Sequence, residues 1–216
     1  DTACAFFDAD QDGDNDLYVG SGGNTEDPVN GDYIDRFYLN DGKGNFKLSM
    51  SSFPKKAMNT SVLLPMDYDR DGDTDLLVAS RSVPQIYGLD APIYLYQNVG
   101  KGKFKETLAA LNPDLAKGGM VTDAKWQDID HDGKNELIIV GDWMAPQLFS
   151  FNGKSFVRKS TNLDQMFGFW NTVVVEDLDM DGHPDLLLGN LGTNFYLKAD
   201  DKNPLKLWIN DFDQNR

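Results

Sequence analysis

Four short acidic stretches share one spacing of side chains suited to metal binding. Each has acids at positions 1, 3, 5 and 9, a glycine at position 6, and an apolar run after position 9. The acids are Asp8, Asp10, Asp12 and Asp16 in loop 1; Asp67, Asp69, Asp71 and Asp75 in loop 2; Asp128, Asp130, Asp132 and Glu136 in loop 3; and Asp177, Asp179, Asp181 and Asp185 in loop 4. A fifth loop would use Asp211, Asp213 and Asn215. The shared frame indicates one chemistry repeated along the chain.

That chemistry is the binding of a hard divalent cation. Two like charges 4 Å apart repel by roughly 4 kcal/mol at an effective dielectric constant of 20, so alternating acids in a tight loop need a counter-ion. Calcium accepts six to eight oxygen ligands in a flexible shell, whereas zinc and copper prefer nitrogen or sulfur. We expect position 7 to contribute its backbone carbonyl, because its side chain varies freely. The residues at position 7 are Asp14, Asp73, Lys134 and His183. The sequence thus predicts about four calcium sites, or five with the last loop.

The loops differ from an EF-hand, which needs a bidentate Glu at position 12 and a helix on each side. Position 12 is Val19, Val78, Ile139 or Leu188, each inside a β-rich apolar run. The loops are therefore expected between strands, with a positive φ at the glycine. The alternative is a set of solvated Asp-Gly turns joining hairpins, which the fourfold recurrence of the frame disfavours.

Composition describes a folded acidic protein. The chain has 216 residues, 40% hydrophobic residues and a net charge of −15, and about half of its 35 acids belong to the four loops. Bound calcium would offset much of that charge, and the absence of a basic stripe argues against nucleic acid as a partner. No apolar run is long enough to span a membrane. Cys4 is the single cysteine, so no internal disulfide forms, and it is expected to be a small buried residue of the first strand.

The loops recur about 50–60 residues apart, which is typical of a repeat architecture. In each repeat an apolar strand enters the loop, a second leaves it, and a third and fourth flank a Gly-containing hairpin. Four short antiparallel strands form one blade of a β-propeller. We therefore predict an all-β fold and a single repeat region, 1–216, of about three and a half blades. The blades would cover roughly 1–50, 58–108, 121–159 and 171–216, the last incomplete, with the remaining blades outside this segment.

Strand order also predicts two distinct faces. The calcium loops and the hairpins would share one face, and the long connections the other. The connections 20–36, 80–92, 108–119, 141–146 and 159–171 carry candidate ligand-binding side chains, namely Tyr33, Arg81, Trp143 and Trp170. Aromatic residues in loops on a rigid scaffold are typical of a binding surface. The alternative is that Trp143 and Trp170 pack between blades.

The sequence resembles the FG-GAP/VCBS repeats of integrin α-subunit propellers and bacterial surface proteins. Its closest likeness is to the repeat region of cartilage-acidic-protein/UnbV-like (ASPIC-type) proteins. The likeness rests on the four loops and on the segments 38–46, 140–144, 170–171 and 189–194. The resemblance implies a calcium-stabilised propeller in an extracellular or cell-surface protein that binds other molecules, with calcium ligands on the loop aspartates. The chain starts without Met or a signal sequence, and we expect it to be a piece of a longer exported polypeptide.

The leading functional prediction is a non-catalytic binding or adhesion module whose ligand is a protein or a glycan. The sequence contains no nucleophile motif, and both histidines lie inside metal loops. The alternative is a propeller polysaccharide lyase, in which calcium would neutralise a uronate and Arg36 or Arg81 would abstract a proton.

Overall fold

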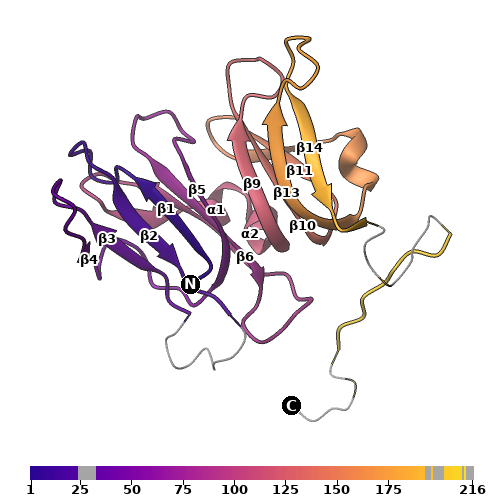
Figure 1. Ribbon diagram of the computed structural model, residues 1–216, viewed down its shortest axis with the longest axis horizontal. Helices are drawn as coiled ribbons and strands as arrows, with labels where there is room; N and C mark the ends of the chain where they lie inside the picture. The colour runs from indigo at the N-terminus through magenta and orange to yellow at the C-terminus, as the bar shows by residue number, and fades with distance from the viewer. Residues whose placement is uncertain (24–32, 193–195, 197–201, 211, 213–216) are drawn as a thin grey trace.

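The computed structural model describes residues 1–23, 33–192, 196, 202–210 and 212 (Figure 1). The described strands form two four-stranded antiparallel sheets and one six-stranded sheet. The six-stranded sheet consists of a third four-stranded blade and the strand pair that begins a fourth. Blade 1 consists of β1 (Ala3–Phe7), β2 (Asp16–Gly20), β3 (Arg36–Leu39) and β4 (Lys47–Leu48); blade 2 of β5 (Asn59–Met66), β6 (Asp75–Ser82), β7 (Ile93–Asn98) and β8 (Phe104–Glu106). Blade 3 consists of β9 (Met120–Gln127), β10 (Glu136–Met144), β11 (Gln147–Phe151) and β12 (Phe156–Lys159), and blade 4 begins with β13 (Gly168–Glu176) and β14 (Asp185–Asn190).

Within each blade, neighbours in sequence are neighbours in the sheet, which is the up-and-down order of a propeller blade. The all-β prediction is therefore confirmed. Blades 3 and 4 are also joined by two bridges at the end of β10, Asp142 to Phe169 and Met144 to Gly168. The segment 205–209 carries no strand, and the proposed fifth loop at Asp211, Asp213 and Asn215 lies outside the described residues.

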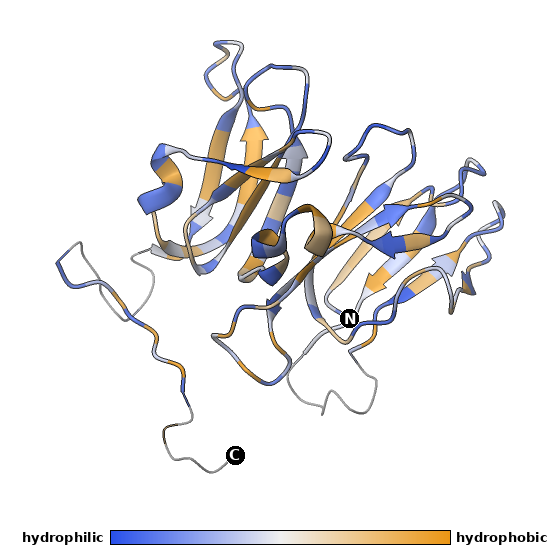
Figure 2. Ribbon diagram, turned by 180° about the vertical axis from the view of Figure 1, so that it is seen from behind, coloured by the Kyte–Doolittle hydropathy of each residue, from blue (hydrophilic) through white to orange (hydrophobic). Residues whose placement is uncertain are grey.

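Hydrophobic cores lie between consecutive blades, because the second strand of each inner blade is buried on both faces. In β6, Leu76 and Val78 pack toward blade 1, whereas Leu77 and Ala79 pack toward blade 3. In β10, the same alternation sends Leu137 and Ile139 to one core and Ile138 and Val140 to the next. Figure 2 shows the apolar residues concentrated in the strands and the hydrophilic ones in the loops. Face-to-face stacking of blades therefore sets the position of every loop that leaves these strands.

Two of the predicted long connections need correction. Residues 108–119 contain two short helices, α1 (Leu108–Leu111) and α2 (Pro113–Lys117). Asn112 starts α2 by accepting backbone N–H bonds from Asp114 and Leu115, with a proline at the first helical position. The predicted connection 141–146 is mostly strand, since β10 runs on to Met144. Ahead of β13, residues 162–165 form one 3-10 turn, η2 (Asn162–Gln165).

The prediction for Cys4 was wrong, because its side chain is exposed. In β1 the residues that point inward are Ala5 and Phe7, so the alternation of the strand turns Cys4 outward. Within the described part of the chain, no helix is long and apolar enough to cross a membrane.

Candidate metal centres

All four acidic loops are shaped by the same three hydrogen bonds. Position 1 accepts from the N–H of the glycine at position 6, position 5 accepts from the N–H of position 7, and position 9 accepts from the N–H of position 2. In loop 2 these bonds join Asp67 to Gly72, Asp71 to Asp73, and Asp75 to Tyr68. The equivalent bonds occur in loops 1, 3 and 4. Each loop thus folds around its own carboxylates.

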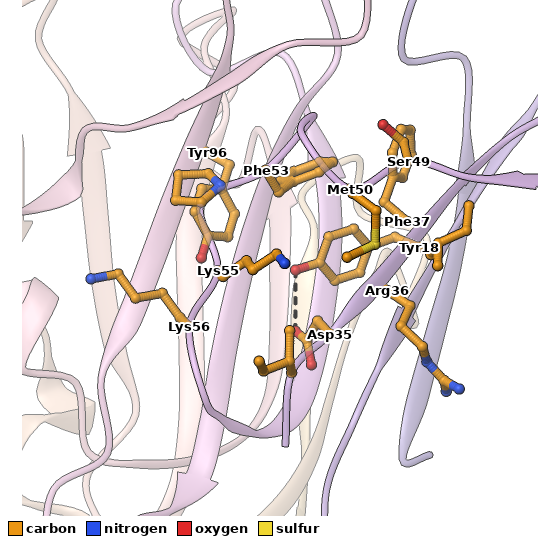
Figure 3. Close-up of a pocket in the computed structure, with 13 residues that line it drawn as sticks. Tyr18, Asp35, Arg36, Phe37, Ser49, Met50, Phe53, Lys55, Lys56 and Tyr96 are labelled. Carbon is orange, nitrogen blue, oxygen red and sulfur yellow. Dashed lines mark hydrogen bonds between the residues drawn. The ribbon is translucent and has the colours of Figure 1, made fainter. Parts of the chain in front are cut away.

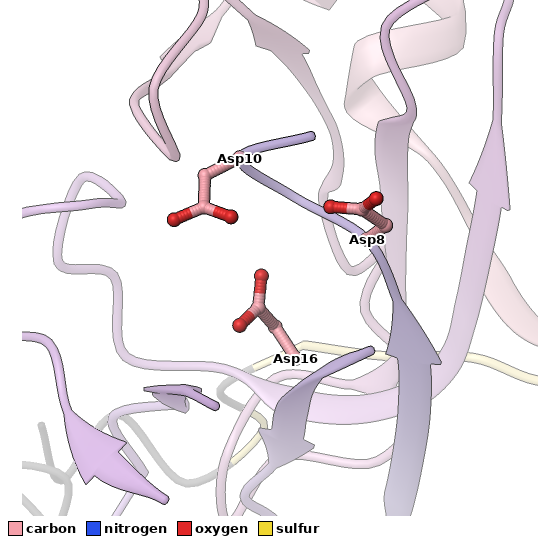
Figure 4. A group of neighbouring side chains, drawn as sticks. All are labelled: Asp8, Asp10 and Asp16. Carbon is pink, nitrogen blue, oxygen red and sulfur yellow. The ribbon is translucent and has the colours of Figure 1, made fainter. Parts of the chain in front are cut away.

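The glycine at position 6 has the positive φ that the sequence predicted, from +81° in Gly133 to +92° in Gly13 and Gly72. Glycine takes this conformation without the steric cost that a Cβ brings. The resulting bend turns three carboxylates of each loop toward one centre, as Figure 4 shows for Asp8, Asp10 and Asp16. They stand at positions 1, 3 and 9 in loops 1, 3 and 4, and at positions 1, 3 and 5 in loop 2.

Each loop gathers three carboxylate oxygens within 4.8 Å of one another. The groups are Asp8, Asp10 and Asp16 in loop 1; Asp67, Asp69 and Asp71 in loop 2; Asp128, Asp130 and Glu136 in loop 3; and Asp177, Asp179 and Asp185 in loop 4. The acids at positions 1, 3 and 5 lie in the turns, and the acid at position 9 is the first residue of the strand that follows. Twelve of these sixteen acids belong to the groups. The side chains of Asp14, Asp73, Lys134 and His183 at position 7 do not.

Several carboxylate oxygens of loops 1, 2 and 3 are buried without a hydrogen-bond donor. They are Asp10 Oδ1 and Asp14 Oδ1 in loop 1, Asp67 Oδ1 and Asp69 Oδ1 in loop 2, and Asp128 Oδ1 in loop 3. A buried carboxylate oxygen without a partner is costly, and a cation removes that cost. The donor set is oxygen only and flexible, which fits calcium. The loop aspartates are therefore suited to hold calcium, which would tie the strands on either side of the loop together.

The pKa values reflect the crowding of acids. Burial and the carboxylates of Asp12 and Asp8 raise the pKa of Asp10, and burial followed by the charge of Asp71 raises that of Asp69. Burial also raises the pKa of Asp75 to about 7. In loop 3 the corresponding shift is reversed, because a hydrogen bond from Lys159 lowers the pKa of Asp130. A basic side chain thus bonds to the carboxylates of loop 3, whereas burial and neighbouring acids dominate the pKa shifts of Asp10 and Asp69 in loops 1 and 2.

Contacts between neighbouring loops, which the sequence had not indicated, start from position 4. Gln11 Nε2 donates to Gly72 O at 3.4 Å and to the Asp73 carboxylate, and Arg70 Nη2 donates to Gly133 O. The rings of His131 and His183 lie 5.7 Å apart. Position 4 has a positive φ in every loop, between +58° and +63°. In loops 1 to 3 the side chain in this position contacts the next loop, and the residue type there varies too much for the sequence to have indicated it.

Asn98 also joins two loops, and sequence reasoning missed it. Its Nδ2 donates to Ala9 O at 2.9 Å and to Thr74 O at 3.2 Å, and its backbone N–H donates to Asp75 Oδ1 at 2.8 Å. Only 3% of Asn98 is exposed. A signal did exist, since an asparagine opens the hairpin of each of the first three blades, at Asn40, Asn98 and Asn152.

The repeating loops and blades match a known repeat. A family model described as FG-GAP-like repeat matches residues 8–78, 67–139 and 128–188. Each matched segment begins at position 1 of one loop and ends in the strand that leaves the next loop. The chain belongs to the FG-GAP-like repeat family. Successive FG-GAP-like segments overlap by one loop and the strand after it, so loops 2 and 3 are each shared by two matches. Comparison with curated proteins gave no match.

Of the four candidate ligand-binding residues on the other face of this FG-GAP-like chain, two need correction. Tyr33 is 2% exposed and Trp170 6% exposed. Trp170 packs in the core between blades 3 and 4, and its Nε1 donates to Met166 O. Neither ring is available to a ligand, in line with the alternative considered for Trp170. The other two residues do reach the surface. The side chain of Arg81 is about half exposed, and Trp143 is partly buried.

Arg81 and Trp143 meet at a cluster built around a buried acid. Arg81 Nη2 lies 2.8 Å and its Nε 2.9 Å from Asp142 Oδ2, and Asp142 is 2% exposed. Tyr87 donates its hydroxyl to the same oxygen at 3.3 Å and accepts the indole N–H of Trp143 at 3.1 Å. Trp143 packs edge-on against Phe169 and has a φ of +59°, a strained conformation for a bulky residue.

A second feature of this face is a cavity of about 270 Å³ at the junction of blades 1 and 2 (Figure 3). Its walls include the rings of Tyr18, Phe37, Phe53 and Tyr96, and Lys55 and Lys56 line it as well. Asp35 at its edge accepts hydrogen bonds from the Tyr18 hydroxyl, the Thr60 hydroxyl and the Ser21 N–H. Burial raises the pKa of Asp35 to about 6, although these bonds lower it.

Asp35 should make stability depend on pH. A folded-state pKa near 6, against about 3.9 when unfolded, means that the folded state binds the proton more tightly. The contribution is fully present below about pH 4 and is lost as pH rises through about 6. We expect the melting temperature of the wild type minus that of Asp35→Asn to fall by a few degrees from pH 4 to pH 7. Calcium release at low pH affects both proteins and cancels in the difference. A difference that stays constant or rises over this range would contradict the prediction.

Proposed function

We propose that this chain is a calcium-stabilised β-propeller binding module of an exported or cell-surface protein, without catalytic activity of its own. The proposed ligand is a protein or a glycan, and nucleic acid is not a proposed partner. Within the family, we propose that it is most similar to the cartilage-acidic-protein/UnbV-like repeats. The observation that carries the proposal is the convergence of three carboxylate oxygens in each of four equivalent loops.

Calcium in these loops would stabilise the fold and would not contact the ligand. The loops join the first and second strands of each blade, so an ion there fixes the entry to the most buried strand, such as β6 or β10. Loops 1, 2 and 3 also contact their neighbours, so ions would stiffen the whole face. The other face would then be presented on a rigid scaffold, which lowers the entropic cost of binding.

The proposed ligand contact is the cluster of Arg81, Tyr87, Asp142, Trp143 and Phe169. It combines partly exposed aromatic rings with a guanidinium that a buried carboxylate orients. Such anchors dominate the binding energy of many interfaces.

The lyase alternative is less well supported by the arginines it needs. Arg81 forms an ion pair with Asp142, and Arg36 with Asp1. A guanidinium bonded to a carboxylate is a poor proton acceptor, because the anion stabilises its charged form. Both side chains are better suited to orienting a ligand than to abstracting a proton.

The experiment is a screen of glycans and extracellular proteins against the calcium-loaded chain, followed by Trp143→Ala. Loss of an aromatic anchor typically costs about 2 kcal/mol or more, so the Kd of the identified ligand should rise about 30-fold. Phe46→Ala is the matched control, because Phe46 is an exposed aromatic residue outside this cluster. Release of unsaturated product from a polyuronate would instead favour the lyase, and equal effects of the two variants would remove the cluster from the ligand site.

A further inference from the structure

Loop 3 differs from loops 1 and 2 in holding a lysine among its carboxylates. Lys159, the last residue of β12, places its Nζ 2.6 Å from Asp130 Oδ2 and 2.8 Å from Glu136 Oε1. Asp130 and Glu136 are positions 3 and 9, two of the three acids that converge in this loop. Glu136 is fully buried, and only 32% of the Lys159 side chain is exposed. The ammonium therefore lies among the oxygens that would otherwise ligate an ion.

The equivalent place in blades 1 and 2 carries a short neutral side chain. Lys159 pairs with Leu148, which in turn pairs with the residue two places after Glu136. The same path leads from Asp16 to Ser49 and from Asp75 to Thr107, through the bonds Ser49 N to Phe37 O and Thr107 N to Leu95 O. A hydroxyl in loops 1 and 2 is thus replaced by a cation in loop 3.

Position 9 changes together with this residue. In loops 1 and 2 one oxygen of the position-9 aspartate accepts a backbone N–H from the hairpin, Asn40 N to Asp16 and Asn98 N to Asp75. In loop 3 the longer Glu136 keeps the bond to Ile129 N and directs its other oxygen to Lys159. Glu136 is one methylene longer than the aspartates of loops 1 and 2, and its second oxygen accepts from the Lys159 ammonium in place of a backbone N–H of the hairpin.

Loop 3 also has more positive charge around it and fewer unpartnered oxygens. Loops 1 and 2 each have an aspartate at position 7, where loop 3 has Lys134. Arg70 reaches across from loop 2 to Gly133 O. One buried oxygen of loop 3 lacks a donor, Asp128 Oδ1, against two in each of loops 1 and 2. Charge and hydrogen bonding in loop 3 are thus largely balanced by the chain itself.

We propose that the Lys159 ammonium takes the place of calcium in loop 3, so that this loop is an internal, calcium-independent staple between β12 and the start of β10. Calcium lies 2.3–2.6 Å from its oxygens, so an ion bound by Asp130 and Glu136 would need the space and the charges that Lys159 now uses. Repulsion between the two cations reinforces the exclusion. The inference rests on the proposed calcium sites in the other loops.

The test is the calcium stoichiometry of the intact chain, measured by isothermal titration after removal of bound metal. Two matched variants remove the position-1 carboxylate, Asp67→Asn in loop 2 and Asp128→Asn in loop 3. We expect Asp67→Asn to lose one equivalent of calcium and Asp128→Asn to lose none. Lys159→Thr, which gives blade 3 the residue of blade 2, should gain one equivalent, and adding Asp128→Asn to it should remove that equivalent again.

Equal losses in Asp67→Asn and Asp128→Asn would overturn the inference while leaving calcium binding by the module intact. Absence of calcium binding in the wild type would overturn the proposed calcium sites themselves, and the inference with them. If Lys159→Thr does not fold, the comparison of Asp67→Asn with Asp128→Asn decides the matter alone.

Discussion

Removing calcium should lower the melting temperature of the chain by on the order of 10–20 °C. A site filled at a hundred times its Kd adds about 2.7 kcal/mol to the free energy of unfolding, so loops 1 and 2 alone would contribute about 5 kcal/mol. A domain of this size shifts by about 2–4 °C for each kcal/mol. This loss of about 5 kcal/mol is a large share of the free energy of unfolding of a typical domain, which is about 5–15 kcal/mol. The measurement is a thermal melt in excess calcium and again in EGTA.

Magnesium is the control for this experiment. It demands near-octahedral geometry and dehydrates reluctantly, so at equal concentration it should restore little of the lost stability, whereas added calcium should restore all of it. Elemental analysis of the purified protein gives an independent readout. A melting curve unchanged by EGTA, together with no stoichiometric calcium, would contradict the metal centres.

Replacing Asn98 by alanine should destabilise the chain by about 2–4 kcal/mol, because it leaves the carbonyls of Ala9 and Thr74 without their donor in a buried setting. The same change should weaken calcium binding in both loop 1 and loop 2, since Asn98 joins the two loops. Chemical denaturation gives the stability, and calcium titration gives the affinities.

Asn40→Ala is the matched control. Asn40 opens the hairpin of blade 1 and donates to Asn15 O of its own loop, in an exposed position. Asn40 makes the same bonds within its blade as Asn98 does, but it has no counterpart of the bond from Asn98 to Ala9 O in the neighbouring blade. We expect it to cost about 1 kcal/mol or less. Similar losses in Asn40→Ala and Asn98→Ala would show that the bond to Ala9 contributes nothing.

The sequence predicted the repeat well because the repeat is local. Nine residues determine each loop, and short apolar runs determine the strands, so blades 1 to 3 each contain the four antiparallel strands that the repeat predicts. The glycine conformation at position 6 also follows from residue type alone. Four copies of one pattern made each prediction stronger than any single copy would have.

What the sequence did not indicate depends on contacts between distant residues. Lys159 is an ordinary strand lysine until sheet pairing places it beside Glu136, 23 residues earlier. Arg81 and Asp142 are 61 residues apart, on different blades. The burial of Tyr33 and Trp170 and the exposure of Cys4 depend on which way one residue turns in a short element, and a shift of one position reverses that direction.

The position-4 contacts have a polarity. Loops 1, 2 and 3 each contact the loop that follows, Gln11 with Gly72, Arg70 with Gly133 and His131 with His183. The chemistry of the contact differs at each of these junctions. The contacts between neighbouring loops are therefore specific to the order of the blades. If the blades were rearranged in a different order, each loop would keep its internal hydrogen bonds, but the side chains at the junctions would no longer meet their partners. These three junctions therefore favour one order of neighbouring blades.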